Sequence, residues 1–567
     1  MRTSAVLVVL AVIHSPPPVA AATIVATEAA DVCSPSTDPC VIRDTVKPID
    51  GAILDFGARR VEIVSPGKLD IGAGEVEVRC GELRTAVGET LVIDVRGPAG
   101  PDGSEGGFLT IVARRVCSVG GAVCLTDAGC AGGTCTVGTG NVVLDGVVRA
   151  DAAFPGLLAI EAAGSVSLMG QIVVSSTDAE GDGGLLDVLA YGGSITVDAA
   201  IEAVGGRLAS GGEVVLTAGQ DVIVRSSIDV SGGEFDGGVF SVEAGRDLGF
   251  SGAVHASATR LDGAGGEVSM SASRDLRLMG TAFVETDGGR SGSFSGDGGQ
   301  QLYSSGRDLS VASGVVLRAN GAKPEGRGGT ISLDADGDAI VGGLVDARAP
   351  TPTSEGGSID VSACALTIVS GASISNYGVE GENVLTGRSS VRVEASSSIL
   401  ADPSSGANRV VYRDPGSRPQ LSGTIVPPAV LELDPALPSC FGTTPTTHFS
   451  PTTTTPTTTT VTSPPRDCGD GLVTGSEECD GGSASWTVGR ACRTDCTLVA
   501  CGDPNDSGDL TAVDALFILR AAVEIEECDS CVCNVDASPG PPSSTDALRV
   551  LRAGVGAPII LECPPCS

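Results

Sequence analysis

The stretch that decides the fold is residues 213–233, which read EVVLTAGQDVIVRSSIDVSGG. Three short segments in it alternate apolar and polar residues: 214–218, 222–224 and 228–230. A period of two places Val214, Leu216 and Ala218 on one face of a strand. The segments are too short and too interrupted by glycine to be helices. We therefore expect three short β-strands, closed by the pair Gly232-Gly233.

The first of these segments recurs along the chain as an apolar-x-apolar-x-Ala motif, mostly at steps of 26 or 28 residues. The copies end at Ala113, Ala162, Ala190, Ala218, Ala244, Ala272, Ala335 and Ala363, with a degenerate copy, Gln301-x-Tyr303-x-Ser305. Three short strands in a unit of about 28 residues predict an all-β fold, a right-handed parallel β-helix. The alternative, an array of β-sandwiches, is disfavoured by the uniform period and by the lack of hairpin dipeptides.

Composition limits the partners and the chemistry. The 567 residues carry 35 Lys and Arg against 70 Asp and Glu, so the net charge is −35, which repels nucleic-acid phosphates. Aromatic residues are 3% of the chain, so the core must be built from Val, Leu, Ile and Ala. Of the three histidines, His14 lies in a leader and His448 in a linker, which leaves His255. We therefore expect no zinc cluster, no Ser-His-Asp triad and no nucleic-acid partner.

The chain begins like an exported protein. Arg2, an apolar run over 5–13 and the small residues at 20–22 follow the order of a signal peptide, which we assign to residues 1–22. No later stretch approaches 18 apolar residues, so we expect no membrane span. In a secreted or cell-surface protein the 19 cysteines are expected to form disulfides, and the odd count leaves one free or intermolecular.

The pattern predicts five segments. After the signal peptide comes the β-helix, residues 23–440, with a Cys-rich insertion at 117–135. A linker rich in Thr and Pro spans 441–466, because such a composition cannot bury a core. Two small modules follow, at 467–500 and 501–567.

Aspartates recur at the turn after the Ala position, and in three copies the turn reads Arg-Asp-Leu, with Arg246, Arg274 or Arg307 first. The aspartates are Asp221, Asp247, Asp275, Asp308 and Asp338. One interpretation is a ladder that binds calcium or a polyanion. The other, which we favour, is turn chemistry: Asp caps backbone N–H groups and Arg offsets its charge. A separate acidic turn, Asp178, Glu180 and Asp182, is expected to be an exposed loop.

The periodicity and the turn at 244–248, Ala-Gly-Arg-Asp-Leu, resemble bacterial β-helix proteins of the filamentous-haemagglutinin and pectin-lyase-like kind. The resemblance implies an adhesin or an enzyme that cuts acidic polysaccharides. The chain shows no dense carboxylate cluster with a basic partner and few aromatic residues for sugar stacking, so we assign no catalytic residue. Asp229, His255 and Glu285 fall close in repeat phase and form the catalytic hypothesis that is simplest to test.

Residues 468–496 contain Cys-Gly-Asp-Gly at 468–471, Glu-Glu-Cys-Asp at 477–480 and two further cysteines, Cys492 and Cys496. They resemble a short Cys-rich repeat of myxobacterial-type secreted and surface proteins. A module of about 30 residues needs disulfides to stay folded.

Residues 503–514 form a twelve-residue loop in which oxygen-bearing residues suit Ca²⁺, and an apolar helical pattern follows. A second copy begins at Asn534 and ends at Asp546. The expected ligands are Asp503, Asn505, Ser507, Asp509, Thr511, Asp514, Asn534, Asp536, Ser538, Ser543 and Asp546. Two loop–helix halves resemble a dockerin, which implies a cohesin-like protein partner; the alternative is that calcium only folds the module. The second half departs from the pattern by Asn534 and one extra residue, so weaker or no binding is expected there.

Together these features predict a secreted or cell-surface, non-catalytic rod with a structural or adhesive role, attached through the calcium-dependent module, with a polysaccharide or surface ligand. The alternative is a polysaccharide lyase or glycoside hydrolase on the same rod.

Overall fold

The computed structural model describes residues 22–85, 88, 90–98, 104–118, 122–126, 129–130, 134–260, 262–291, 294–440, 490–492, 498–504, 510, 512–522, 528, 530–535, 542–554 and 561. The signal-peptide prediction, the 441–466 linker and most of the 467–500 module lie outside these residues. The chain divides into two compact units, residues 1–446 and 447–567, and each is described by itself.

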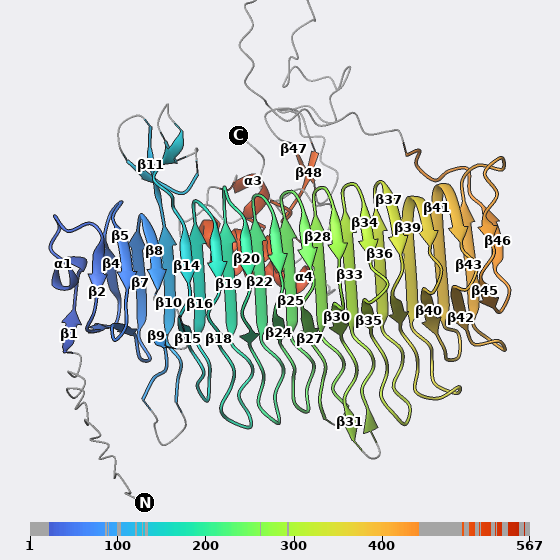
Figure 1. Ribbon diagram of the computed structural model, residues 1–567, viewed down its shortest axis with the longest axis horizontal. Helices are drawn as coiled ribbons and strands as arrows, with labels where there is room; N and C mark the ends of the chain where they lie inside the picture. The colour runs from blue at the N-terminus through green and yellow to red at the C-terminus, as the bar shows by residue number, and fades with distance from the viewer. Residues whose placement is uncertain are drawn as a thin grey trace, which may run out of the picture. The chain divides into compact units, whose positions relative to one another are not determined.

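The first unit is a stack of β-strand coils, so the predicted all-β, parallel β-helix class is confirmed (Figure 1). Each coil contributes one strand to a 15-stranded sheet, here called sheet A, and two strands to a 26-stranded sheet, here called sheet B. Sheet B has a long-strand face and a short-strand face, which are one sheet because β39 (Ser358–Ile368) and β41 (Glu382–Val393) run through both.

The strands of sheet A are β1 (Thr23–Ala26), β3 (Thr45–Pro48), β6 (Lys68–Asp70), β9 (Leu91–Asp94), β15 (Val147–Arg149), β18 (Ile172–Val173), β21 (Ile201–Glu202), β24 (Ser227–Asp229), β27 (Ala253–His255), β30 (Phe283–Glu285), β35 (Val316–Arg318), β38 (Leu344–Asp346), β40 (Ser373–Asn376), β42 (Ser398–Ala401) and β45 (Thr424–Val426).

The long-strand face of sheet B holds, besides β39 and β41, β4 (Ala52–Asp55), β7 (Glu75–Cys80), β10 (Phe108–Ala113), β16 (Leu157–Ala162), β19 (Leu185–Ala190), β22 (Glu213–Ala218), β25 (Val239–Ala244), β28 (Glu267–Ala272), β33 (Gln300–Ser305), β36 (Thr330–Ala335), β43 (Ala407–Tyr412) and β46 (Val430–Leu433). The short-strand face adds β2 (Cys40–Ile42), β5 (Arg60–Ile63), β8 (Glu82–Thr85), β14 (Val142–Leu144), β17 (Val166–Leu168), β20 (Ile195–Val197), β23 (Val222–Val224), β26 (Leu248–Phe250), β29 (Leu276–Leu278), β34 (Leu309–Val311), β37 (Asp338–Val341) and β44 (Gln420–Leu421).

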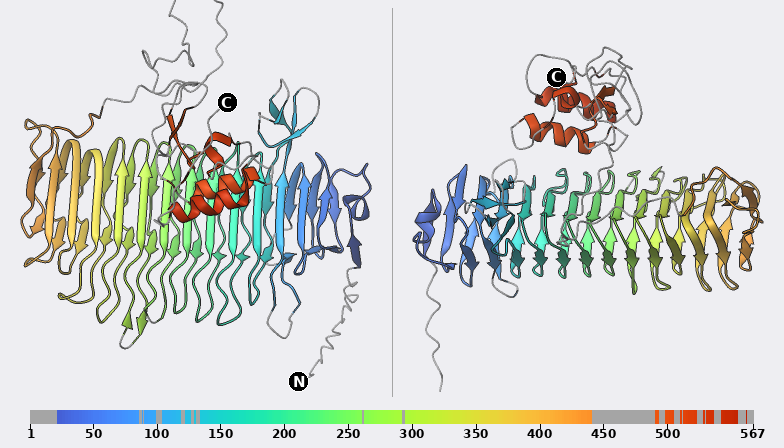
Figure 2. Two further views of the ribbon diagram at one scale, coloured as in Figure 1. Left: turned by 180° about the vertical axis from the view of Figure 1, so that it is seen from behind. Right: turned by 90° about the horizontal axis from the view of Figure 1, so that it is seen from above.

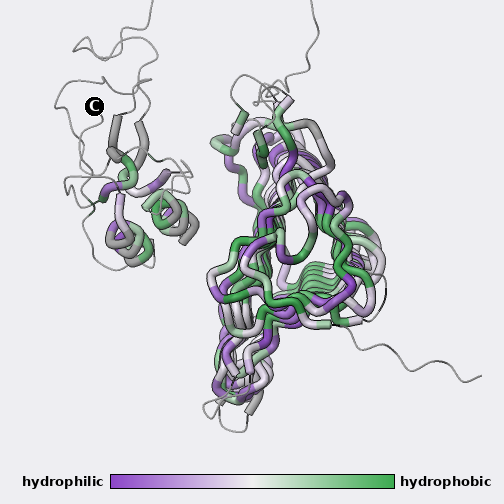
Figure 3. The backbone as a smooth tube through the Cα atoms, turned by 90° about the vertical axis from the view of Figure 1, so that its left-hand side faces the viewer, coloured by the Kyte–Doolittle hydropathy of each residue, from purple (hydrophilic) through white to green (hydrophobic). Residues whose placement is uncertain are grey.

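The predicted motif copies pair in parallel and in register, so equivalent residues stack from coil to coil. Val214 lies between Leu186 and Phe240, and Ala218 lies between Ala190 and Ala244. Their side chains point inward and are buried, whereas the intervening residues face outward. Stacked ladders of this kind fill the narrow interior mainly with aliphatic side chains. Figure 3 shows the coils stacked behind one another in a view along the rod.

The degenerate copy also joins the stack. Gln301 and Tyr303 take inward positions in β33 between β28 and β36. The Tyr303 hydroxyl donates to Gln301 Oε1 at 3.0 Å, and Gln301 Nε2 donates to the Arg318 carbonyl at 2.8 Å. These bonds satisfy the polar groups inside the core.

The 117–135 segment is a small disulfide-tied insertion, as predicted. It forms a three-stranded antiparallel sheet of β11 (Arg115–Cys117), β12 (Val123–Cys124) and β13 (Cys135–Val137). Its disulfides are Cys117–Cys130 and Cys124–Cys135. A second excursion is the hairpin of β31 (Arg290–Ser291) and β32 (Phe294–Ser295), which extends from the row of loops along one side of the rod (Figure 2).

The first coil is covered by a short helix, α1 (Ala29–Val32), which contacts β1 and β4. The Cys33–Cys40 disulfide ties the end of this helix to β2. Cys364 of β39 pairs with Cys440, and Cys80 is the free cysteine among the described residues.

The second unit holds a pair of strands, β47 (Arg490–Cys492) and β48 (Leu498–Ala500), and three helices, α2 (Ala512–Ala522), α3 (Ser530–Cys533) and α4 (Ser544–Gly554). Helices α2 and α4 contact each other, and Cys528 pairs with Cys533. Ile518 and Val550 lie in its small apolar core. Among the described helices of the chain, none has both the length and the apolar content of a membrane span.

Candidate functional site

The residues that the repeat phase places together lie in one row on the outer face of sheet A. Asp229 of β24 pairs with His255 of β27, and His255 pairs with Glu285 of β30. The row continues through Arg318 of β35 and Asp346 of β38. Parallel strands in register set neighbouring side chains about 4.8 Å apart, so the three predicted residues are brought together.

The centre of this row is a cluster of charged groups. His255 Nδ1 lies 3.4 Å from Glu285 Oε2. Arg318 forms an ion pair with Glu285 and, through Nε, a second one with Asp287 Oδ2 at 2.9 Å. The Phe283 ring lies beside both basic side chains, 5.6 Å from the His255 ring and 5.4 Å from Arg318 Cζ. The outer face of sheet A therefore holds acid, base and cation within one hydrogen-bonded group.

These contacts shift the protonation of the row. The hydrogen bond with Glu285 raises the pKa of His255 above its ordinary value. Burial alone would raise the pKa of Glu285, but the His255 hydrogen bond and the Arg318 charge outweigh it and lower that pKa to about 2. Burial raises the pKa of Asp287 to about 6, against the opposing effects of the Asn320 N–H and Arg318.

Sequence reasoning missed Arg318 and Asp287. Arg318 lies 33 residues after Glu285, because the intervening coil contains the β31–β32 hairpin and is longer than 28 residues. Asp287 lies two residues after Glu285 and so is close to it in an extended chain. Both residues could have been found by aligning the copies on their third strand, which belongs to sheet A, instead of on the Ala motif.

A groove adjoins this cluster along the rod. It has a volume of about 510 Å³ and is open to solvent. The backbone N–H of Asn320 donates to Asp287 Oδ1 at 2.8 Å, and Asn320 also lines the groove, so the two features share an element. The groove is lined by Asn320, Gly321, Lys323, Arg348, Ala349, Pro350, Ser375, Tyr377 and Leu400.

Three of the recurrent aspartates, Asp221, Asp247 and Asp308, cap backbone groups of the next coil, as the favoured interpretation of the turn predicts. Each bond joins a carboxylate to an N–H about one coil later: Asp247 N–H to Asp221, Asp275 N–H to Asp247, and Asp338 N–H to Asp308. The arginines pair with the aspartate of the preceding coil, with Arg246 Nε 2.6 Å from Asp221 Oδ1 and Arg274 Nε 2.6 Å from Asp247 Oδ1. These bonds hold the pKa of Asp221 and of Asp247 below the ordinary value.

Aspartates at a second corner of the coil, on the side of the loops, also accept backbone hydrogen bonds from the next coil. Asp182 accepts the Ser210 N–H at 2.9 Å, Asp236 accepts the Ala264 N–H at 2.8 Å, and Asp297 accepts the Arg327 N–H at 2.7 Å. The acidic turn at Asp178, Glu180 and Asp182 is exposed, as predicted. Its carboxylates take part in loop geometry, since Asp178 also accepts the Glu180 N–H at 3.0 Å.

In the second unit, four of the five described members of the two expected calcium loops are buried, and Ser543 is partly exposed. Asp503 and Asp514, at positions 1 and 12 of the first loop, are 1% and 0% exposed, and Asn534 and Asp546 are fully buried. Oxygen atoms buried at both ends of a loop fit a hard cation, because a buried carboxylate needs a compensating charge. The remaining expected ligands lie outside the described residues, apart from Ser543: they are Asn505, Ser507, Asp509, Thr511, Asp536 and Ser538.

The second loop is closed by hydrogen bonds. Asp546 Oδ1 accepts the Val535 N–H at 3.0 Å, and Oδ2 accepts the N–H and the hydroxyl of Ser543 at 2.8 and 2.7 Å. Both carboxylate oxygens therefore have partners within the protein.

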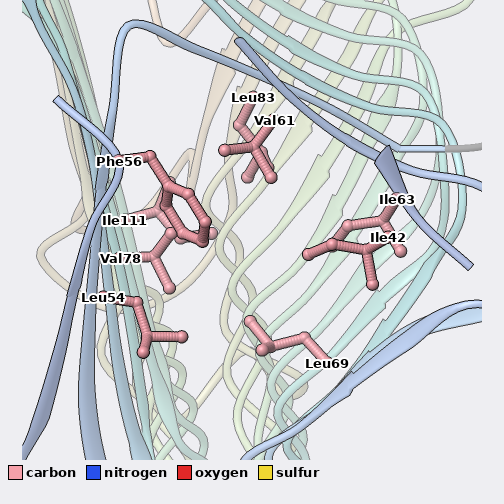
Figure 4. Close-up of a pocket in the computed structure, with 9 residues that line it drawn as sticks. All are labelled: Ile42, Leu54, Phe56, Val61, Ile63, Leu69, Val78, Leu83 and Ile111. Carbon is pink, nitrogen blue, oxygen red and sulfur yellow. The ribbon is translucent and has the colours of Figure 1, made fainter. Parts of the chain in front are cut away.

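The enclosed pocket at the first coils is part of the core. Figure 4 shows nine apolar side chains around it, among them Phe56, Leu69 and Ile111. Its volume of about 10 Å³ is at the lower limit for one water molecule, and its lining offers no polar partner. It therefore offers no room for a ligand.

No protein-family model, curated protein or solved structure matches the chain.

Proposed function

We propose that the protein is a secreted or cell-surface β-solenoid rod with a non-catalytic, structural or adhesive role, attached through a calcium-dependent, dockerin-like module at 501–567. The observation that carries the proposal is the use of the corner carboxylates: they cap the backbone of the next coil or pair with an arginine between coils. A repeated group that holds neighbouring coils together serves the rod itself.

The row on sheet A supports the same conclusion. Glu285 and Asp287 are both engaged by Arg318, and Asp287 also accepts the Asn320 N–H. Asp287 is 8% exposed, so little of its side chain is accessible to a substrate. The cluster resembles a link between coils more than a reaction centre.

The module at 501–567 supplies the attachment in this proposal. Asp503, Asp514 and the intervening loop oxygens would hold Ca²⁺ in the first half, and the ion would neutralise the two buried carboxylates. Helices α2 and α4, which follow the two loops, would then present the surface for a cohesin-like protein partner. The filamentous-haemagglutinin-like rod, the myxobacterial-type Cys-rich repeat and the signal peptide of 1–22 complete the proposed secreted protein.

Calcium titration of the purified full chain by calorimetry tests the attachment module. We expect one tight site, which Asp503→Asn abolishes because it removes a charged ligand from the first loop. The matched control Asp182→Asn, on the rod, should leave binding unchanged. Absence of tight calcium binding to the wild-type chain would refute the calcium-dependent module.

A second candidate function, a polysaccharide lyase or glycoside hydrolase, is favoured by one observation. The groove of about 510 Å³ brings Lys323, Arg348 and the exposed Tyr377 next to the Asp287 cluster. Cations suit the carboxylates of an acidic sugar, and an aromatic ring suits its apolar face.

Product release decides between the two candidates. The full chain is incubated with acidic and neutral polysaccharides and Ca²⁺, and new reducing ends and unsaturated uronides are measured. The proposed rod releases neither. Release that is lost in His255→Gln and Asp287→Asn, and kept in Asp182→Asn, would establish the enzyme instead.

A further inference from the structure

The two ends of the rod differ in whether the terminal coil is covered. At the first coil, α1 lies over β1 and β4, and Val32 and Cys33 pack against the apolar core. At the other end, within the part of the chain that the structure describes, β44, β45 and β46 each pair with one strand only, on the side of the preceding coil. Their outer edges therefore present backbone donors and acceptors to solvent.

Among the described residues, the apolar ladders also stop at this end without a polar cap. Val393 is followed by Leu421, Ile399 by Ile425 and Val410 by Leu431. The preceding rungs are no more than 1% exposed, whereas Leu431 is 42% exposed. Leu433, which follows Tyr412 and Gly387 in the ladder of Ala363, is 43% exposed. At outward positions, Val426 and Val430 are exposed by 39 and 60%. A terminal coil that ends in solvent is ordinarily polar on its outer side, so an apolar one calls for a cover.

The chain that follows turns away from this end. After β46, Cys440 is tied by its disulfide to Cys364 of β39. Strands β41 and β43 separate β39 from β46 along the sheet. Cys440 therefore lies beside a strand that precedes β46 by three positions in the sheet. The sequence that follows it is rich in Thr and Pro and has few apolar residues that could complete the ladders.

The last coil carries little net charge, so two copies of it can approach each other. Between Gln420 and Leu433 the chain has one charged residue, Glu432, and Arg409 neutralises it with Nη2 2.6 Å from Oε2. In a chain of net charge −35, this end is one that two copies bring together without strong repulsion. A head-to-tail contact is disfavoured, because α1 covers the opposite end.

We propose that the last coil, Gln420–Leu433, is a dimerisation surface on which a second copy of this chain docks end to end, related by a two-fold axis. The two-fold relation reverses the sense in which the coil runs, so each open strand runs antiparallel to the strand that it faces, and the edge groups then meet complementary groups. The apolar ladders continue from one rod into the other. The proposal goes beyond the rod function, since a tail-to-tail pair displays two attachment modules on one double-length rod.

Light scattering of the purified full chain at micromolar concentration tests this proposal, with electron microscopy for rod length. We expect twice the mass of one chain and rods of doubled length. Val430→Lys, at a side chain that is already 60% exposed, should reduce both to the single-chain values without changing the circular dichroism of the folded chain. Val426→Lys, at an outward side chain that is 39% exposed, is a second variant with the same expectation.

The matched control is Ile53→Lys, at a 48% exposed side chain of β4 near the covered end, and it should remain dimeric. A wild-type chain with the mass of one copy, whether because its own tail covers the end or because nothing does, would overturn the proposal. So would a dimer that survives Val430→Lys or is lost in Ile53→Lys. Calcium binding is unaffected in every case, so these outcomes are distinct from failure of the attachment module.

Discussion

The burial and the reactivity of Cys80 are set by its position in a ladder of stacked residues. It is 0% exposed and pairs with Ala113, which in turn pairs with Ala162, so it occupies the alanine position of its coil. Burial raises the pKa of its thiol to about 12. We expect no reaction with a thiol reagent in the folded protein and one thiol per chain in denaturant. Cys80→Ala should cost about 1 kcal/mol or less, because alanine fills the equivalent positions; a reactive thiol in the folded chain would contradict this placement.

His255 provides a second test at the scale of one residue. Glu285→Gln removes the charge that stabilises the imidazolium, so the pKa of His255, followed by NMR, should fall. Because the folded-state pKa is raised, the contact stabilises the rod below the unfolded histidine pKa of about 6.5 and is lost as pH rises through the folded value. The difference in melting temperature between wild type and Glu285→Gln should therefore shrink as pH rises. An unchanged His255 titration would show that the contact is not formed; Asp178→Asn is the control.

At the scale of the element, a corner between two coils is stabilised by a side-chain carboxylate that accepts a backbone hydrogen bond from the next coil. Asp236→Ala removes the acceptor of the Ala264 N–H and should cost about 0.5–1.5 kcal/mol. Hydrogen exchange at the Ala264 amide should accelerate. Asp236→Asn keeps an acceptor oxygen and should restore most of the protection. Equal exchange in all three proteins would mean that the bond does not stabilise the corner.

The insertion is an element with its own means of stability. The buried core cluster within it consists of four cysteines, Cys117, Cys124, Cys130 and Cys135, all in disulfides. Replacing the Cys117–Cys130 pair with serines should remove about 3 kcal/mol from this small sheet and open it to trypsin at Arg115. The rod should melt as before, because β10 and β14 on either side keep their partners in sheet B. Loss of the rod transition would show that the insertion supports the stack.

At the scale of the whole molecule, the chain has two compact units that draw on different sources of stability. The first buries long apolar ladders, and the second has a small core with buried carboxylates. If calcium neutralises those carboxylates, chelation should lower the melting temperature of the second unit by several degrees and leave the first unchanged. Calorimetry with and without chelator measures both transitions. A melting temperature of the second unit that is the same with and without chelator would show that calcium does not stabilise it.

Much of this architecture follows from local pattern. The three strands expected at 214–218, 222–224 and 228–230 are observed at Glu213–Ala218, Val222–Val224 and Ser227–Asp229, because a period of two and a period of 28 both leave their mark on the sequence. The phase of Asp229, His255 and Glu285 follows from the same counting. A coil that contains a hairpin loses that phase, and for this reason Arg318, which follows the hairpin, was not found.

The sequence by itself determined the strand repeat, the inward and outward faces, the Asp caps and the disulfide-tied insertion, because each depends on residues close in the chain or on strict periodicity. Only the tertiary structure decided the Arg318 cluster, the groove beside it, the position of the unpaired cysteine inside the core and the open last coil. These depend on which residue of one coil lies beside which residue of the next. That alignment is set by the cumulative length of the intervening loops, and loop lengths vary freely because solvent, not the core, surrounds them.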